Sequence, residues 1–278
     1  MTLIFEYLNY SFVRYALIVG VLISFCSSLL GNILVSKKMS FIGDSLSKLA
    51  FLITSVATIL KLSSNFFITL IGTTIFTIFL LNKKNSLIKR DDSMLAMISV
   101  VSLALGYICI NLFSNSSNIT ADVCTTLFGS TSILTLRPYM VVACILLSIF
   151  ILIMFVLFYN KIYLVTFDED FALSNGINVE RINFLISIMT SFTIVLSMYL
   201  VGSLLITALI IFPTLCARFL VKSFKNTIVV SSILSIACAL IGMITSILMG
   251  TPVGSTIVVI NFIAYIICLI ASKILIRR

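Results

Sequence analysis

Asp44 and Lys48 are the residues of this sequence whose types and spacing most directly suggest chemistry. They lie four residues apart in the stretch FIGDSLSKLA, at the start of a long apolar run. In an α-helix this spacing places both side chains on one face. A single charge within a membrane helix costs about 2.5–3.5 kcal/mol on insertion scales, and an opposite charge beside it offsets part of that cost. The pair therefore predicts a functional polar site, or else a lysine that only extends toward the membrane surface.

The rest of the sequence contains no recognisable catalytic or metal-binding motif. It has no histidine and no CxxC or other zinc-site spacing. It also has no GxSxG elbow, P-loop or HExxH motif. Six of the seven cysteines fall within apolar segments, where cysteine behaves as a small hydrophobic residue, and only Cys124 lies in a connection. We expect no enzyme activity, no disulfide framework and no cofactor bound by this chain.

The composition is typical of an integral membrane protein. Hydrophobic residues make up 61% of the chain and charged residues 10%, against about 45–50% and about 25% in soluble domains. The apolar runs approach the roughly 20 residues that a helix needs to cross the hydrocarbon core. The sequence predicts an all-α, polytopic helical bundle with eight or nine transmembrane helices, as a single domain over residues 1–278. The nine apolar segments are residues 12–35, 45–60, 66–81, 93–113, 139–159, 182–200, 203–220, 227–248 and 255–276.

The net charge of +9 reports membrane topology rather than binding to nucleic acid. We place the connection NKKNSLIKRDD (residues 82–92) in the cytosol and let the segments alternate from it. Fourteen of the 18 basic residues then fall on the cytosolic side, as the positive-inside rule expects. Nine spans would put the N-terminus outside the cell and the C-terminus inside. The first segment lacks a small-residue cleavage site and is interpreted as a mature span.

The connection TFDEDFALSNGINVER (residues 166–181) carries the signals of a short cytosolic helix. Asp168, Glu169 and Asp170 would stand in its first turn, and Gly176 would follow its end. The helix would also carry apolar residues. Its acidic start favours docking to a protein partner over lying on the lipid headgroups, because inner-leaflet lipids attract basic segments.

Two further segments depart from regular spans. The long outside connection, residues 113–138, contains an interrupted apolar piece at residues 124–136, which predicts a re-entrant or interfacial helix. Pro213 lies well inside the segment of residues 203–220 and predicts a helix break. Broken helices often border the substrate path of a transporter, although a simple kink explains the proline equally well.

Five stretches, in order along the chain, resemble the ABC-type permeases that import zinc, manganese or iron. KKMSFIGDSLSK (residues 37–48) is similar to their GD-small-Leu-Ser-His stretch, and ADVCTTLFGS (121–130) to their outside D…LFG segment. LVTFDEDFALSNGI (164–177) resembles their cytosolic FD…A…GI loop. VGSLLITALIIFPTLCARFL (201–220) and TPVGSTIV (251–258) resemble their proline-containing helix and their late P-x-G-x-x-I-V turn. Together these matches cover nearly the whole chain.

The resemblance implies a multi-pass subunit in the plasma membrane of a bacterium. It implies a homodimer, or a heterodimer with a sister permease, together with a cytosolic ATP-binding subunit that uses ATP and an extracellular solute-binding protein. Membrane lipid is a further expected partner, and nucleic acid is not. The ATPase is expected to couple through Phe167, Asp168, Phe171, Ala172 and Gly176. The outer gate, or the contact with the binding protein, is expected at Asp122, Phe128 and Gly129.

The resemblance also implies that Asp44 faces the transport pathway and is a candidate metal ligand. In the family a histidine stands four residues on, whereas here Lys48 occupies that position, and Thr125 stands where relatives often carry another histidine. An imidazole offers a lone pair to a metal, but an ammonium group has three donors and no acceptor. Lys48 is therefore expected to lock a gate with Asp44, to change the substrate, or to mark a divergent permease without high-affinity metal handling.

Two functions follow from these residues. The first is the membrane-spanning permease subunit of an ABC importer for a divalent transition metal. The alternative is a divergent or regulatory permease-like protein, or an ATP-independent facilitator, whose substrate is altered by Lys48.

Overall fold

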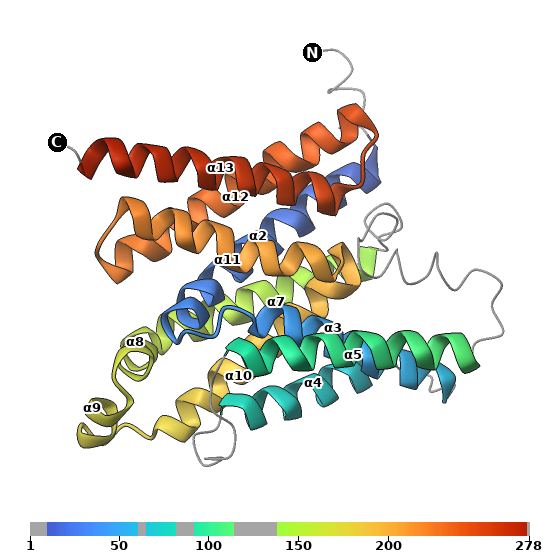
Figure 1. Ribbon diagram of the computed structural model, residues 1–278, viewed down its shortest axis with the longest axis horizontal. Coiled ribbons are helices and arrows are strands. Elements are labelled where there is room, and N and C mark those ends of the chain that lie inside the picture. The colour runs from blue at the N-terminus through green and yellow to red at the C-terminus, as the bar shows by residue number, and fades with distance from the viewer. Residues whose placement is uncertain (1–9, 61–64, 82–91, 114–137, 277–278) are drawn as a thin grey trace.

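The computed structural model describes residues 10–60, 65–81, 92–113 and 138–276, and within these ranges all regular structure is helical (Figure 1). The expected all-α class is confirmed. In chain order the helices are α2 (Ser11–Ser36), α3 (Ile42–Ile59), α4 (Asn65–Leu81), α5 (Asp92–Phe113), α7 (Pro138–Leu157), α8 (Tyr159–Phe167), α9 (Glu169–Ser174), α10 (Val179–Val201), α11 (Ser203–Leu220), α12 (Phe224–Met249) and α13 (Val253–Ile276).

Seven of the described helices are long and apolar enough to cross a membrane: α2, α3, α5, α10, α11, α12 and α13. The pair α7 and α8 gives an eighth candidate, and it is bent by 72° at its break. This bend, next to Phe158, lies at the end of the apolar segment of residues 139–159, and the sequence did not predict the helix α8 that follows it. Helix α4 is apolar but has only 17 residues. The described part of the chain thus supports seven or eight spans, where the sequence predicted eight or nine.

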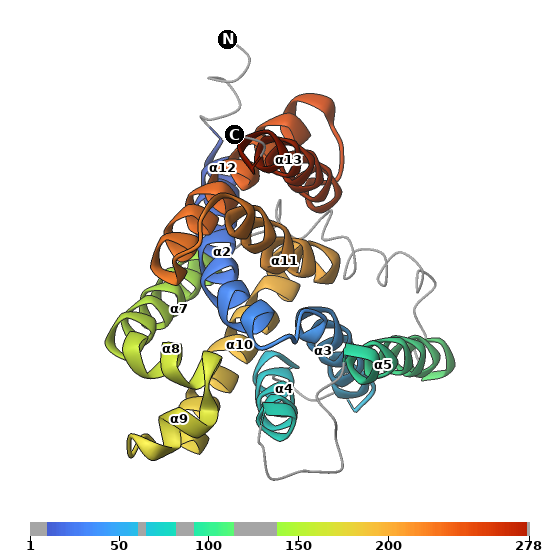
Figure 2. The ribbon, with the colours of Figure 1, turned by 60° about the vertical axis from the view of Figure 1, so that its left-hand side comes forward.

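Helix α2 runs through the middle of the bundle, in contact with α7, α10, α11 and α12 (Figure 2). Its side chains at Leu30, Ile33 and Leu34 are almost completely buried. A Cβ atom at Gly31 would overlap the carbonyl oxygen of Ile210 in α11. Lipid tails are as apolar as leucine, so helices in a membrane associate through close packing of this kind rather than through a hydrophobic force. Helices α2 and α11 can pack this closely only with glycine at position 31.

Hydroxyl groups join helices in the interior. The hydroxyls of Thr69 in α4 and Tyr199 in α10 lie 3.2 Å apart. Eight residues further along α4, Ser191 of α10 donates to the hydroxyl of Thr77 at 2.9 Å. Such bonds between membrane helices contribute about 0.6 kcal/mol on average. They fix the relative register of α4 and α10 without adding much stability.

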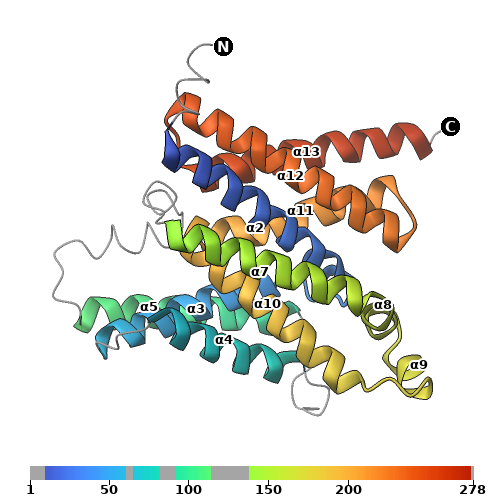
Figure 3. The same ribbon diagram turned by 180° about the vertical axis from the view of Figure 1, so that it is seen from behind.

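The first described helix begins at one end of the bundle, and the last one ends at the other. Helix α9, the connection from α11 to α12 and the C-terminal end of α13 share one end, whereas the start of α2 and the turn from α12 to α13 lie at the other (Figures 1 and 3). Of the basic residues expected inside, Arg218 and Lys273 stand in the last turns of α11 and α13, at the end that carries α9. The assignment of that end to the cytosol stays a prediction.

The break expected at Pro213 is not present. Helix α11 continues through this proline as one element from Ser203 to Leu220. Proline removes one backbone donor and thereby frees the carbonyl of Leu209, four residues earlier, and the helix accommodates this loss without a break. The interruption lies instead at Gly202, whose φ of 97° and ψ of 159° separate α10 from α11. A residue with a side chain rarely adopts that backbone conformation, whereas glycine does so readily.

Candidate transport site

The first turn of α3 positions the charged pair. The chain leaves α2 through a tight turn, in which Lys38 has a φ of 57° and the amide of Met39 bonds the carbonyl of Leu34 at 3.0 Å. Helix α3 then begins at Ile42, so that Asp44 lies in its first turn. The unpaired amides at a helix N-terminus favour a negative charge nearby. The start of α3 is therefore a favourable place for a carboxylate at membrane depth.

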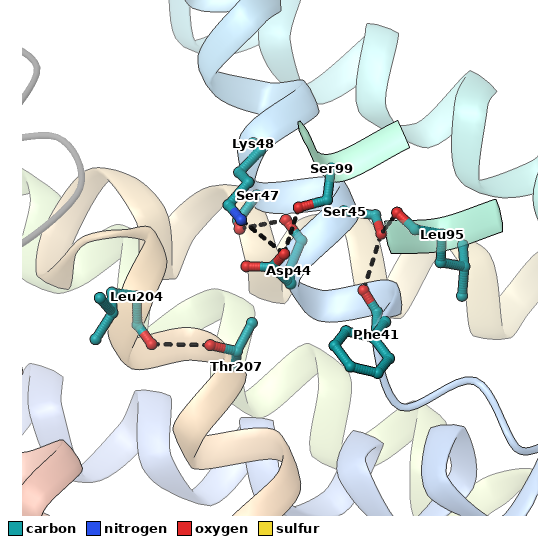
Figure 4. A network of polar contacts seen from close by, with 9 residues as sticks. All are labelled: Phe41, Asp44, Ser45, Ser47, Lys48, Leu95, Ser99, Leu204 and Thr207. Atoms are coloured by element: carbon teal, nitrogen blue, oxygen red, sulfur yellow. Dashed lines mark hydrogen bonds and ion pairs between the residues drawn. The ribbon is translucent and has the colours of Figure 1, made fainter. Parts of the chain in front are cut away.

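Asp44 and Lys48 form an ion pair, with 2.8 Å between Oδ2 and Nζ (Figure 4). The predicted proximity of the two side chains is confirmed. Ser99, from α5, donates its hydroxyl to the same carboxylate oxygen. The side chains of Asp44 and Lys48 are 26% and 25% exposed, so the pair is open to a space beside α3. One oxygen of the carboxylate thus receives a cation and a hydroxyl donor from two different helices.

Helix α5 is fixed against α3 on both sides of this carboxylate. Ser45 donates to the carbonyl of Leu95 at 2.6 Å. Further along, a Cβ atom at Gly106 would lie 2.8 Å from the ring of Phe51. The buried residues of α5 recur every three or four positions, which is the period of one helix face. They are Leu95, Ser99, Ser102 and Gly106.

Helix α11 lies on the other side of the start of α3 from α5 (Figure 2). Leu204 and Thr207 of α11 face the start of α3 (Figure 4), and Gly43 of α3 approaches Ile210, to whose Cδ1 a Cβ would be 2.9 Å away. Thr207 donates its hydroxyl to the carbonyl of Leu204 at 2.9 Å. Phe41 and Leu204 are 46% and 40% exposed, so exposed apolar side chains flank the partly exposed ion pair (Figure 4).

The donor set of this site consists of oxygen atoms. The described residues contain no group of three or more His, Cys, Asp or Glu side chains that could hold a metal. Asp44 supplies one carboxylate, and Ser99 is the hydroxyl group nearest to it. Carboxylate and carbonyl oxygens suit hard cations such as Mn²⁺ better than soft ones. Within the described residues, the donors beside Asp44 are therefore too few for a closed metal-binding site.

The short helix expected in the acidic connection is present as α9. The Asp168 side chain accepts bonds from the amides of Asp170 and Phe171, at 3.1 and 2.9 Å, which caps the helix. At the other end Gly176 has a φ of 74°, and its amide and the next one bond back to the last turn in a Schellman arrangement. Ala172 is buried, whereas Phe167 and Phe171 are 59% and 54% exposed. An acidic and aromatic surface is therefore displayed at the end of the bundle.

Lys37 joins α9 to the turn before α3, a contact that sequence reasoning missed. Its Nζ lies 2.7 Å from Oδ1 of Asn183 in α10 and 3.4 Å from Oε1 of Glu169 in α9. The Lys37 side chain is only 3% exposed. The sequence signal was slight, because Lys37 looks like one of many lysines expected in the cytosol.

The residues expected on the outside are not part of the structure described. Asp122, Phe128 and Gly129, and the piece 124–136, lie outside the described residues.

Comparison with known proteins agrees with this architecture. Residues 9–272 match the ABC 3 transport family. The high-affinity zinc uptake system membrane protein ZnuB of Buchnera aphidicola subsp. Acyrthosiphon pisum is 30% identical over 253 residues, which cover 91% of this chain and 94% of that protein. The manganese transport system membrane protein MntC of Listeria monocytogenes is 27% identical over 266 residues, covering 94% and 90%.

A solved structure has the same fold. It is PsaBC from Streptococcus pneumoniae in complex with Fab, which superposes with a TM-score of 0.81 at 25% identity and covers 95% of this chain and 93% of that one. A second structure, an inward-facing conformation of a metal-chelate type ABC transporter, has a TM-score of 0.68 at 15% identity and supports the fold alone. This chain therefore belongs to the ABC 3 transport family, as a multi-pass permease of the bacterial cell membrane.

Proposed function

We propose that the chain carries a divalent transition metal into the cell, as the permease of an importer driven by a separate ATPase. Zinc and manganese are supported by the names of its relatives, whereas iron stays an expectation from the resemblance. The observation that carries the proposal is the partly exposed Asp44 carboxylate, held by Lys48 and Ser99 at the start of α3 (Figure 4). The oxygen donors make manganese the first metal to test.

In this proposal Lys48 closes the path by occupying Asp44. An incoming divalent cation carries twice the charge of the ammonium group and competes for the same carboxylate oxygen. Because both side chains are about one quarter exposed, the lysine can swing away without crossing a packed core. The metal would replace Nζ at Oδ2, and the hydroxyl of Ser99 would remain as an oxygen neighbour.

The partners belong to the same proposal. The ATPase would dock on α9, whose exposed Phe167 and Phe171 flank a capped acidic turn. A solute-binding protein would deliver the metal at the opposite end, near Asp122, Phe128 and Gly129. A second permease, identical or a sister chain, would close the open space beside Asp44. Counting α4 and the bent α7–α8 pair as spans gives nine among the described helices, an odd number that agrees with the start of α2 and the end of α13 lying at opposite ends of the bundle (Figure 1).

Lys48 also favours a second candidate function. A lysine at the metal position suits a permease-like protein with another substrate, or a facilitator that works without ATP. These candidates differ from the first in their need for an ATPase and in their response to Lys48→His. A divergent permease would gain metal uptake when histidine restores a lone-pair donor.

The test is uptake of radioactive manganese and zinc by cells that lack their own importers. The chain is expressed with its ATPase and binding protein, and compared with Asp44→Asn and with Glu180→Gln, which removes an exposed carboxylate of α10. We expect uptake that is lost with Asp44→Asn and retained with Glu180→Gln. Unchanged uptake in Asp44→Asn contradicts the pathway assignment. Uptake only with Lys48→His supports a divergent permease, and uptake without the ATPase supports a facilitator.

A further inference from the structure

An apolar groove runs along the lipid-facing side of the bundle between α7 and α12. Its volume is about 540 Å³, within the range of small-molecule sites. Phe25 and Leu29 of α2 form its floor, and Leu152, Phe155 and Val156 of α7 form one wall. The other wall belongs to α12, with Ile228, Val229, Ser232, Ile233 and Ile236. Only Ser232 is polar among these, and its hydroxyl already accepts a bond from Ser28 at 3.1 Å. The groove therefore suits a hydrocarbon chain.

A lysine stands at the mouth of this groove. Lys225 is exposed, lies in the first turn of α12 and lines the same groove. No ion pair within the described ranges engages its Nζ. Beside it Phe224 packs on Tyr159, with ring centres 6.3 Å apart, and on Tyr163, at 5.3 Å. Tyrosine rings are enriched at the level of lipid headgroups. The mouth thus combines a positive charge with the aromatic residues of a membrane interface.

The dimensions of the groove match one leaflet of a bilayer. Its residues on α12 run from Lys225 to Ile236, and the eleven steps of 1.5 Å between these twelve positions span about 16 Å. The hydrocarbon core is about 30 Å thick, so one leaflet occupies about half of it. The charged mouth lies at the end of the bundle that carries α8 and α9 (Figure 3). The groove thus extends from that surface to about the middle of the membrane.

The groove faces away from the transport site. Helices α7 and α8 lie on one side of α2, whereas α3 and α5 lie on the other (Figure 2). A second permease that closed the space beside Asp44 would leave the groove uncovered. In a membrane, the molecules available to fill an uncovered apolar groove are lipids. Its positive mouth selects among them for a negative headgroup, because basic pockets between helices on the cytosolic side bind anionic lipids.

We infer that this groove is a binding site for an anionic phospholipid of the inner leaflet. One acyl chain lies between α7 and α12, and the headgroup phosphate pairs with Nζ of Lys225. The uncapped amides in the first turn of α12 add to the attraction, since the N-cap residue Ser223 makes no side-chain bond to them. The inference needs only the membrane location of the chain, so it does not depend on which metal is carried.

The sequence offers a direct test, because it contains no tryptophan. Val156→Trp places a single fluorophore at the groove, and Leu146→Trp places one elsewhere on the exposed face of α7; the two native side chains are 65% and 63% exposed. The full-length chain is placed in phosphatidylcholine vesicles in which a minor share of the lipid is brominated. Quenching by brominated phosphatidylglycerol is compared with quenching by the same share of brominated phosphatidylcholine.

At Val156→Trp we expect the anionic lipid to be preferred about fivefold, the ratio that corresponds to about 1 kcal/mol for one lysine near a charged membrane. Adding Lys225→Gln should bring this ratio close to one, whereas Lys273→Gln, at the end of α13, should leave it unchanged. At Leu146→Trp the ratio should be close to one throughout. Equal ratios at both reporters, or no response to Lys225→Gln, overturn the inference. Weak quenching by both lipids at Val156→Trp would mean that protein covers the groove, and overturns it as well.

Discussion

Lys37→Met is expected to destabilise the protein by about 3–5 kcal/mol, the loss typical of removing one partner from a buried ion pair. The lysine is 3% exposed, and its Nζ donates to Asn183 at 2.7 Å and contacts Glu169 at 3.4 Å. Methionine keeps the length and apolar stem of lysine but has no donor. The amide oxygen of Asn183, itself a residue only 4% exposed, would lose this bond inside the protein.

The two contacts should share this loss unequally. The shorter bond joins a charged donor to a buried amide oxygen, and such bonds contribute about 1.5–3 kcal/mol. The longer contact involves a Glu169 side chain that is 15% exposed. Water can replace part of it, which brings its contribution closer to the 1 kcal/mol or so of a surface pair. We therefore expect the loss to decrease from Lys37→Met through Asn183→Leu to Glu169→Gln.

The measurement is the free energy of unfolding of the purified chain, titrated with a denaturing detergent in mild micelles. Lys38→Met is the matched control, because Lys38 is the next residue, carries the same charge and is exposed. It should change the free energy by no more than about 0.5 kcal/mol. Equal losses for Lys37→Met and Lys38→Met would refute the reasoning from burial. A larger loss for Glu169→Gln than for Asn183→Leu would refute the division between the two contacts.

Two other changes are expected to alter stability by amounts that the contacts set. Gly31→Ala should cost about 3 kcal/mol in the same titration, since its Cβ would overlap the backbone oxygen of Ile210. Gly176→Ala, where only the φ of 74° is unfavourable and no atom lies within 4 Å, should cost about 1–2 kcal/mol; a larger loss than for Gly31→Ala would contradict the packing argument. Tyr199→Phe removes the 3.2 Å contact with Thr69 and should cost about 0.6 kcal/mol. A loss in the free energy of unfolding above about 2 kcal/mol for Tyr199→Phe would show that this hydroxyl pair contributes substantially to stability and contradict the estimate.

Local signals in the sequence were enough to predict several parts of the structure. The i, i+4 spacing of Asp44 and Lys48 predicted an ion pair, and the two side chains meet at 2.8 Å. The acidic residues before Phe171 and the glycine at position 176 predicted a short capped helix, which is α9. Each of these features is decided within a few residues by helix geometry and backbone preference.

Contacts between helices could not be predicted in the same way. Ser99 lies on a regular small-residue face of α5, which shows that the face is packed but not that it packs on Asp44. Lys37 looks like any other cytosolic lysine until the fold brings Glu169 and Asn183 to it. Pro213 predicted a break that α11 absorbs, because the effect of a proline depends on the neighbours that bond the freed backbone. The role of Asp44 in transport still rests on the uptake experiment.

The close approach of Gly31 to the backbone of Ile210 limits which parts of this protein can move during a transport cycle. Where two backbones touch, neither helix can rotate or slide past the other without first separating from it, so α2 and α11 form a fixed frame. Helix α3 approaches that frame at Gly43, where a Cβ would lie 2.9 Å from Cδ1 of Ile210 and 3.9 Å from Cγ2 of Thr207, so side-chain atoms rather than backbone separate the two helices there. Alternating exposure of Asp44 to the two sides of the membrane is therefore expected to come from α3 and α5 shifting together along a stationary α11. The side of the bundle that holds the lipid groove would remain still while the metal passes.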